Sequence, residues 1–99
     1  MTATIKKRFT TIEDFRNAIA NVSEAYSLFD DASYTRITIA GDNIIGRRET
    51  TDDPFEINLT ELFEAQQKLD LISLSTLKLF ITTSAESPAM AILKQLNII

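Results

Sequence analysis

The chain has 99 residues, a formal net charge of −4, and neither cysteine nor histidine. Hydrophobic residues make up 44% and charged residues 24%, with two glycines and two prolines, so disordered, collagen-like and low-complexity classes are excluded. The missing thiol and imidazole groups exclude disulfides, thiolate catalysis, Cys/His zinc sites and phosphohistidine chemistry. A chain of this length predicts one domain, residues 1–99, with one modest core.

The sequence indicates a soluble, cytoplasmic protein. The basic residues near Met1 are followed by no apolar run of the length that a signal peptide needs. No segment reaches the roughly 20 apolar residues that span a bilayer. The absence of cysteine fits a reducing compartment. We therefore expect no membrane contact, and the negative net charge argues against nonspecific binding to DNA.

The N-terminal elements are predicted from local hydrophobic patterns. Residues 4–9 read as a short strand with Lys6 and Arg8 on one side. Residues 10–13, Thr-Thr-Ile-Glu, match a capping box. The apolar residues after it recur at steps of three and four, which predicts an amphipathic helix over residues 11–29.

A hairpin is predicted next. Residues 34–40 alternate as a half-buried strand, with Ile37 and Ile39 on one side and Tyr34, Arg36 and Thr38 on the other. Gly41 suits the first central position of a type II′ turn, so residues 43–49 form the partner strand. A brief extended segment is expected at residues 55–59.

The C-terminal half predicts helix, strand and helix. Asn58 resembles a helix cap, and apolar residues from Leu62 to Ile72 follow helical spacing. Residues 77–82 alternate as a last strand. Ser87 and Pro88 begin a final helix with a stripe over residues 89–96. The last two isoleucines either fold back onto the core or form an exposed apolar tip.

This element order predicts an α+β, βαββαβ(α) ferredoxin-like fold, an open-faced antiparallel sheet with its helices on one side. The order of elements also resembles that of the histidine phosphocarrier of the sugar phosphotransferase system, which is an open-faced sandwich. The essential histidine of that family opens its first helix, where this chain has Thr10 and Thr11. The resemblance therefore implies a fold and no activity.

The predicted layout gathers basic and aromatic side chains on the open sheet face and acidic ones over the helices. The candidate partner-binding residues are Lys6, Arg8, Tyr34, Arg36, Arg47, Arg48, Lys78 and Phe80. Three interpretations remain open: a merely solvated face, a protein interface, or a surface for single-stranded nucleic acid. The last needs aromatic residues on the strand at 44–49, which has none.

Catalysis and metal binding are not expected. The pairs Asp30-Asp31 and Asp52-Asp53 fall in predicted loops, where aspartate commonly serves turns and caps, and the spacing of a calcium loop is absent. We therefore expect no cofactor. The sequence favours a small non-catalytic interaction or regulatory module, an adaptor or inhibitor, that docks an acidic protein partner by its basic sheet face or an edge strand. Self-association through the same sheet is compatible with this hypothesis, and a nucleic-acid-binding domain is the alternative.

Overall fold

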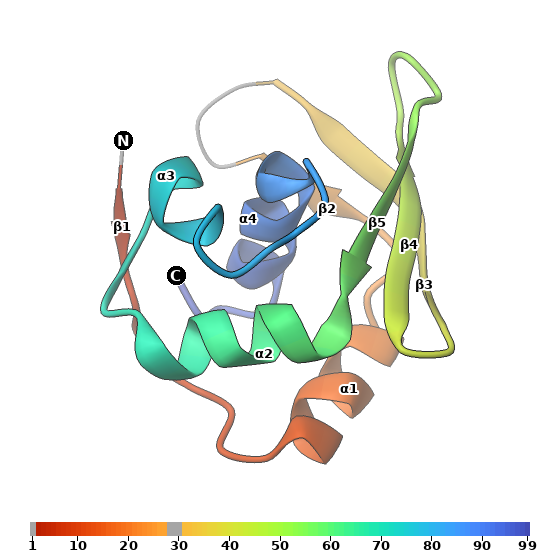
Figure 1. Ribbon diagram of the computed structural model, residues 1–99. Coiled ribbons are helices and arrows are strands. Elements are labelled where there is room, and N and C mark those ends of the chain that lie inside the picture. Colours follow the sequence, from red (N-terminus) through yellow and green to blue (C-terminus); the bar gives the residue numbers. More distant parts are fainter. Residues whose placement is uncertain (1, 28–30) are drawn as a thin grey trace.

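The computed structural model describes residues 2–27 and 31–99 (Figure 1). Its elements, in order, are β1 (Ala3–Thr4), α1 (Ile12–Ala20), β2 (Ala25–Tyr26), β3 (Ser33–Ala40), β4 (Asn43–Arg48), β5 (Pro54–Asn58), α2 (Leu59–Lys68), β6 (Leu71–Ile72), α3 (Leu74–Leu77) and α4 (Glu86–Gln95). The main sheet has the strand order β2-β3-β4-β5, and β1 pairs with β6 in a two-stranded sheet. All pairings are antiparallel. The fold is mixed α+β, which confirms the predicted class.

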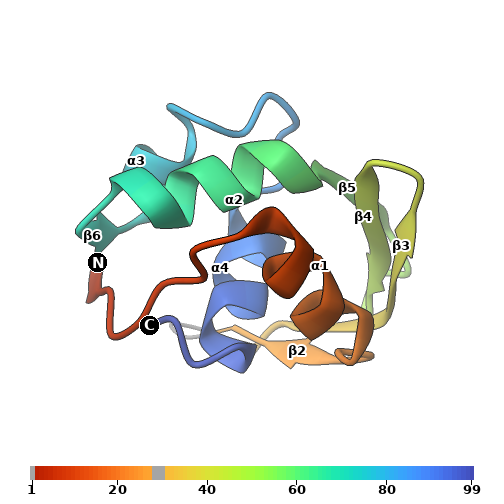
Figure 2. The ribbon, with the colours of Figure 1, turned by 90° about the horizontal axis from the view of Figure 1, so that it is seen from below.

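The helices lie on one side of the main sheet, and the opposite face of β3, β4 and β5 is open (Figures 1 and 2). Helix α4 occupies the centre and packs against β2, β3 and α3. Its residues from Pro88 to Leu93 are all buried, as expected of a helix that is apolar on every side. Among the described residues, no helix is long and apolar enough to cross a membrane.

The strand order differs from the ferredoxin-like prediction and from its phosphocarrier-like alternative. Residues 77–82 form the end of α3 and a turn, because the capping box of Ser73 and Thr76 starts a helix there. Leu77 and Ile81 are buried while Leu79 is 78% exposed. Burial therefore recurs every fourth residue, as in a helical turn, and the alternation of a strand is absent.

The predicted first strand is also mostly irregular. Only Ala3 and Thr4 are in a strand. Beyond them the backbone N–H of Lys6 donates to Ile98, and that of Phe9 donates to the buried side chain of Gln66. Contacts with distant parts of the chain replace a regular ladder here.

The first helix ends earlier than predicted. It stops at Ala20, and Asn21 forms its C-cap. Asn, Val and Ser at positions 21–23 are weak helix formers, and Ala25 instead pairs with Tyr34 in the sheet. The end of the predicted helix, residues 28 and 29, lies outside the described residues.

Local signals placed the hairpin and the start of α2 correctly, but the predicted helical stripe extends too far: α2 ends at Lys68, and Leu71 and Ile72 form β6, which pairs with β1. Gly41 has φ of +64° between β3 and β4, as the first central residue of a type II′ turn requires. The side chain of Asn58 accepts a hydrogen bond from the N–H of Glu61 and begins α2. The caps of the other two long helices are shifted: Thr11 caps α1, and α4 begins after Ala85 without a side-chain cap.

The C-terminus folds back onto the core. Asn97, with φ of +62°, ends α4 in a Schellman motif, in which the N–H groups of Ile98 and Asn97 donate to Leu93 and Lys94. Ile98 and Ile99 are both buried. This settles the two alternatives for the terminal isoleucines in favour of packing.

Candidate functional site

Strand β3 contains a bulge at Arg36. The pairing with β4 shifts by one residue between Thr35 and Thr38, and Arg36 has φ of +55°. An extra residue changes which side chains face the core. Tyr34 and Ile37, three positions apart, are therefore both buried.

Because of the bulge, the predicted position of one site residue, Tyr34, is wrong. Strict alternation put Tyr34 on the open face beside Arg36, but Tyr34 is 3% exposed and packs edge-on against Phe55 in the core, with ring centroids 5.6 Å apart. Because one residue is inserted after it, Tyr34 faces inward together with Ile37.

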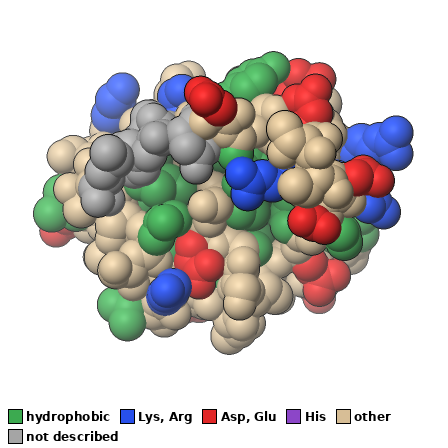
Figure 3. Space-filling model, turned by 90° about the horizontal axis from the view of Figure 1, so that it is seen from above, with side chains coloured by type: hydrophobic (Ala, Val, Ile, Leu, Met, Phe, Trp, Pro, Cys, Tyr) green, Lys and Arg blue, Asp and Glu red, His purple; other side chains and the backbone are tan. Residues whose placement is uncertain are grey.

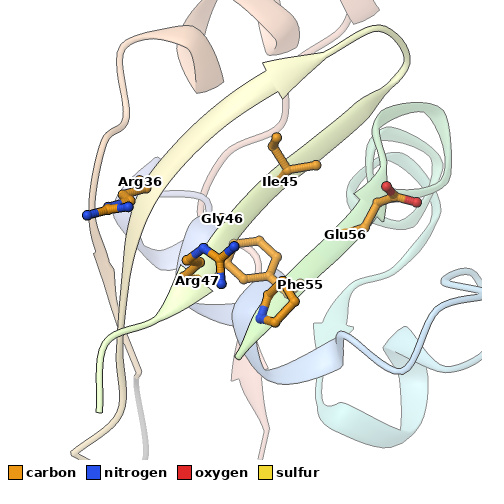
Figure 4. Close-up of a pocket in the computed structure, with 7 residues that line it drawn as sticks. Arg36, Ile45, Gly46, Arg47, Phe55 and Glu56 are labelled. Carbon is orange, nitrogen blue, oxygen red and sulfur yellow. The ribbon is translucent and has the colours of Figure 1, made fainter. Parts of the chain in front are cut away.

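The open face of the sheet, called here the outer face, holds a shallow depression. Paired residues of antiparallel strands share a face, so the pairs of Ile45 with Glu56 and of Arg47 with Pro54 all project outward. With Arg36, Gly46 and Phe55 they line a depression of about 510 Å³. In Figure 4, Arg36 extends at one side, Glu56 at the other, and Ile45 and Arg47 lie between them.

Gly46 makes the floor of this depression possible. A Cβ added at Gly46 would lie 2.6 Å from the ring of Phe55 and 3.1 Å from the backbone oxygen of Thr35. The ring of the directly paired Phe55 therefore occupies the place of the missing side chain. Gly46 and Phe55 are paired in the ladder of β4 and β5, and both line the depression.

The charges around the depression are held apart. Arg47 turns toward the β4–β5 turn, where its Nη1 donates to the backbone oxygen of Asp52 at 2.8 Å and lies 3.8 Å from the carboxylate of the same residue. Among the described residues, neither the guanidinium of Arg36 nor the carboxylate of Glu56 has an ion-pair partner. The depression thus has a cationic side and an anionic side.

The end of the outer face next to β2 is acidic. The hydroxyl of Tyr26 donates to the carboxylate of Glu24 at 3.0 Å, and that of Ser33 donates to Glu49. The hydrogen bond to Glu24, followed by the charge of Glu24, raises the pKa of Tyr26 above its ordinary value of 10.0. Tyr26 is 53% exposed.

Two of the eight predicted site residues, Arg36 and Arg47, lie together on the outer face. Arg48 lies at the other surface of the sheet, where a depression of about 320 Å³ also contains Tyr34 and the start of α4. Lys78 and Phe80 follow α3 and lie outside the sheet, because no strand forms there. Phe80 is half-buried against the core.

The two predicted site residues near the N-terminus, Lys6 and Arg8, also lie outside the main sheet. Arg8 serves the C-terminal end of α2: its Nε donates to the carbonyl of Gln66, and its Nη2 donates to the carbonyl of Leu69 and the carboxylate of Asp70. Lys6 is exposed in the same irregular segment. The first strand that would have brought both onto the main sheet ends at Thr4.

The predicted separation of charge, basic on the sheet and acidic on the helices, is weaker than expected, because only three of the predicted basic residues, Arg36, Arg47 and Arg48, belong to the main sheet. Glu56 of β5 accompanies these arginines in the sheet, and Glu49 directly follows β4. On the face seen from above, basic and acidic side chains are interspersed (Figure 3).

Sequence reasoning missed Ile45, Pro54 and Glu56 as lining residues. Pro54 precedes the extended segment expected at residues 55–59, so the sequence pattern does not predict its pairing with Arg47. The alternation of residues 55–59 was a signal for β5, but its pairing partner depends on the tertiary fold. Within residues 2–27 and 31–99, no group of three or more acidic residues is placed to hold a metal ion.

Comparisons with protein-family models, curated proteins and solved structures gave no match.

Proposed function

We propose that this chain is a small non-catalytic interaction module that binds an acidic segment of another protein on the outer face of its main sheet. The proposal rests on the backbone conformation and the charge of Arg36. This residue adopts a left-handed conformation that costs a non-glycine residue about 1 kcal/mol or more. Its guanidinium lines the depression and has no ion-pair partner among the described residues.

The neighbouring residues support binding of a peptide segment. Ile45, Pro54 and Phe55 give the depression apolar surface, and Arg47 adds a second cation beside it. Arginine beside apolar surface is enriched at protein interfaces. We expect a carboxylate of the partner to lie against the arginines and the aliphatic part of the partner to lie over Ile45.

The geometry favours the sheet face over a sheet edge. Strand β5 is one edge of the main sheet. The hydroxyl of Thr83 already donates to the backbone oxygen of Glu56 at 2.6 Å, so an added strand would have to displace it. The other edge, β2, has only two residues.

A protein partner is favoured over nucleic acid. Glu56 lines the depression, and Glu49 lies near the same face. Carboxylates repel phosphates, and the depression offers one aromatic residue, Phe55, which packs against Tyr34 beneath the sheet. We also expect the module to act in the cytosol, since the chain contains no cysteine.

To test the proposal, the protein is titrated with the peptide acetyl-Thr-Glu-Val-Glu-Thr-amide, and binding is monitored by NMR. Arg36→Glu is expected to weaken binding about fivefold or more, because an attraction becomes a repulsion. Lys78→Glu is the matched control, since it makes the same charge change directly after α3, a helix that lies away from the main sheet (Figure 1).

Equal weakening by the two substitutions would show a general charge effect and reject the site. Tight, salt-sensitive binding of single-stranded oligouridine that Arg36→Glu abolishes would establish the nucleic-acid alternative instead. Sedimentation of the free protein tests self-association: a dimer that Arg36→Glu dissociates would identify a second copy as the occupant.

A further inference from the structure

We infer that the outer-face depression selects an extended segment in which an acidic and a basic residue stand two positions apart. This inference rests on the proposed function and specifies the chemistry of the partner. Its basis is Glu56, an acidic residue that lines a depression whose other charged residues, Arg36 and Arg47, are basic.

The strand register fixes where the opposite charges lie. Glu56 pairs with Ile45, and Arg47 stands two residues further along β4. Such diagonal neighbours have Cα atoms about 7–8 Å apart. Arg36 is on the neighbouring strand β3, on the side of Arg47 away from β5.

The two charges do not satisfy each other, although a long arginine side chain can span such a diagonal. Arg47 instead contacts Asp52 in the turn, and Glu56 has no ion-pair partner among the described residues. A ligand therefore meets cations on one side of Ile45 and an anion on the other.

An extended peptide matches this spacing. Side chains at positions i and i+2 of a strand point to the same side and are separated by about 7 Å. A glutamate at the first position would reach Arg36 and Arg47, and a lysine at the second would reach Glu56. The aliphatic stems of both side chains would cover Ile45 and Pro54.

The experiment compares two peptides that differ at one residue, acetyl-Thr-Glu-Val-Lys-Thr-amide and acetyl-Thr-Glu-Val-Glu-Thr-amide. The unaltered protein is expected to bind the Glu-Val-Lys peptide about threefold more tightly, as one additional exposed ion pair allows. In Glu56→Gln this preference is expected to disappear, while Glu13→Gln, an equal charge change on α1, keeps it.

Each result bears on the inference separately from the proposed function. If both peptides bind equally to the unaltered protein, or if Glu13→Gln abolishes the preference as well, the charge pattern is wrong and the acidic-segment proposal stands. If neither peptide shifts the NMR signals of outer-face residues, the proposed function fails, and the inference fails with it.

Discussion

Gly46 is the residue whose replacement the structure restricts most directly. Gly46→Ala is expected to lower the free energy of unfolding by about 1–3 kcal/mol, because the new Cβ would overlap the ring of Phe55 and approach the oxygen of Thr35. Urea denaturation measures this loss. Combining Gly46→Ala with Phe55→Leu should recover part of it, because the smaller side chain gives way.

Gly41→Asn provides the contrast. Gly41 has open space around it, so a side chain there meets no other atom and only strains the backbone at its positive φ; this substitution should therefore cost less than Gly46→Ala. Equal losses at the two glycines would contradict the crowding beneath β4.

Tyr26 gives a pH-dependent prediction. In Glu24→Gln the pKa of Tyr26 is expected to fall toward its ordinary value of 10.0, since the accepting carboxylate and its charge are removed. Ultraviolet titration measures the change, and Tyr26→Phe identifies which step belongs to this residue. An unchanged midpoint in Glu24→Gln would contradict the assigned cause.

The sign of the stability effect follows from linkage. A raised pKa means that the folded chain holds the Tyr26 proton more tightly than the unfolded chain does. The resulting stabilisation is present below pH 10.0, the ordinary pKa, and is lost as the pH rises through the folded-state pKa.

The bulge in β3 couples stability to the proposed function. Arg36→Gly is expected to raise the free energy of unfolding by about 1 kcal/mol, because glycine adopts positive φ without a steric penalty. The same change should weaken binding of the acidic peptide, because the guanidinium is lost. Thermal denaturation and peptide titration measure the two effects.

Arg36→Ala separates these contributions. It removes the guanidinium but keeps a Cβ, so binding should weaken as in Arg36→Gly without the gain in stability. If Arg36→Gly binds the peptide as well as the unaltered protein does, the arginine has no role in recognition.

The N-terminal segment depends on Arg8 at the end of α2. Arg8→Ala is expected to lower the free energy of unfolding by about 1 kcal/mol, because carbonyl groups of Gln66 and Leu69 lose their donor. Peptide affinity should not change. Lys6→Ala, an exposed position nearby, is the control and should leave stability unchanged.

Elements with strong local signals were predicted well. The turn at Gly41 and the cap at Asn58 depend on neighbouring residues only, and both are confirmed. The strand expected at residues 77–82 does not form. Its apolar residues alternate as in a strand, but the capping box at Ser73 starts helix α3 immediately before them. Arg36 lies on the open face, as predicted, but no local sequence pattern predicted the bulge that moves Tyr34 into the core.

At the scale of the whole molecule, the prediction of helices on one side of a sheet holds, and the strand order does not. The four central strands form a meander, so the N-terminal segment and the segment after α3 contribute no basic residues to its outer face. Long-range pairing determined that result, and hydrophobic periodicity does not encode it. The candidate site consequently contracts from eight residues to the depression around Arg36 and Arg47.

An amide NMR map of the protein titrated with acetyl-Thr-Glu-Val-Glu-Thr-amide decides whether the outer face is the binding site. The shifted signals are expected to cluster on the outer face, at Arg36, Ile45, Arg47 and Glu56, while signals from α1 and α3 remain in place. Shifts that concentrate instead on the N-terminal segment, α3 or the start of α4 would show that the outer face is not the binding site.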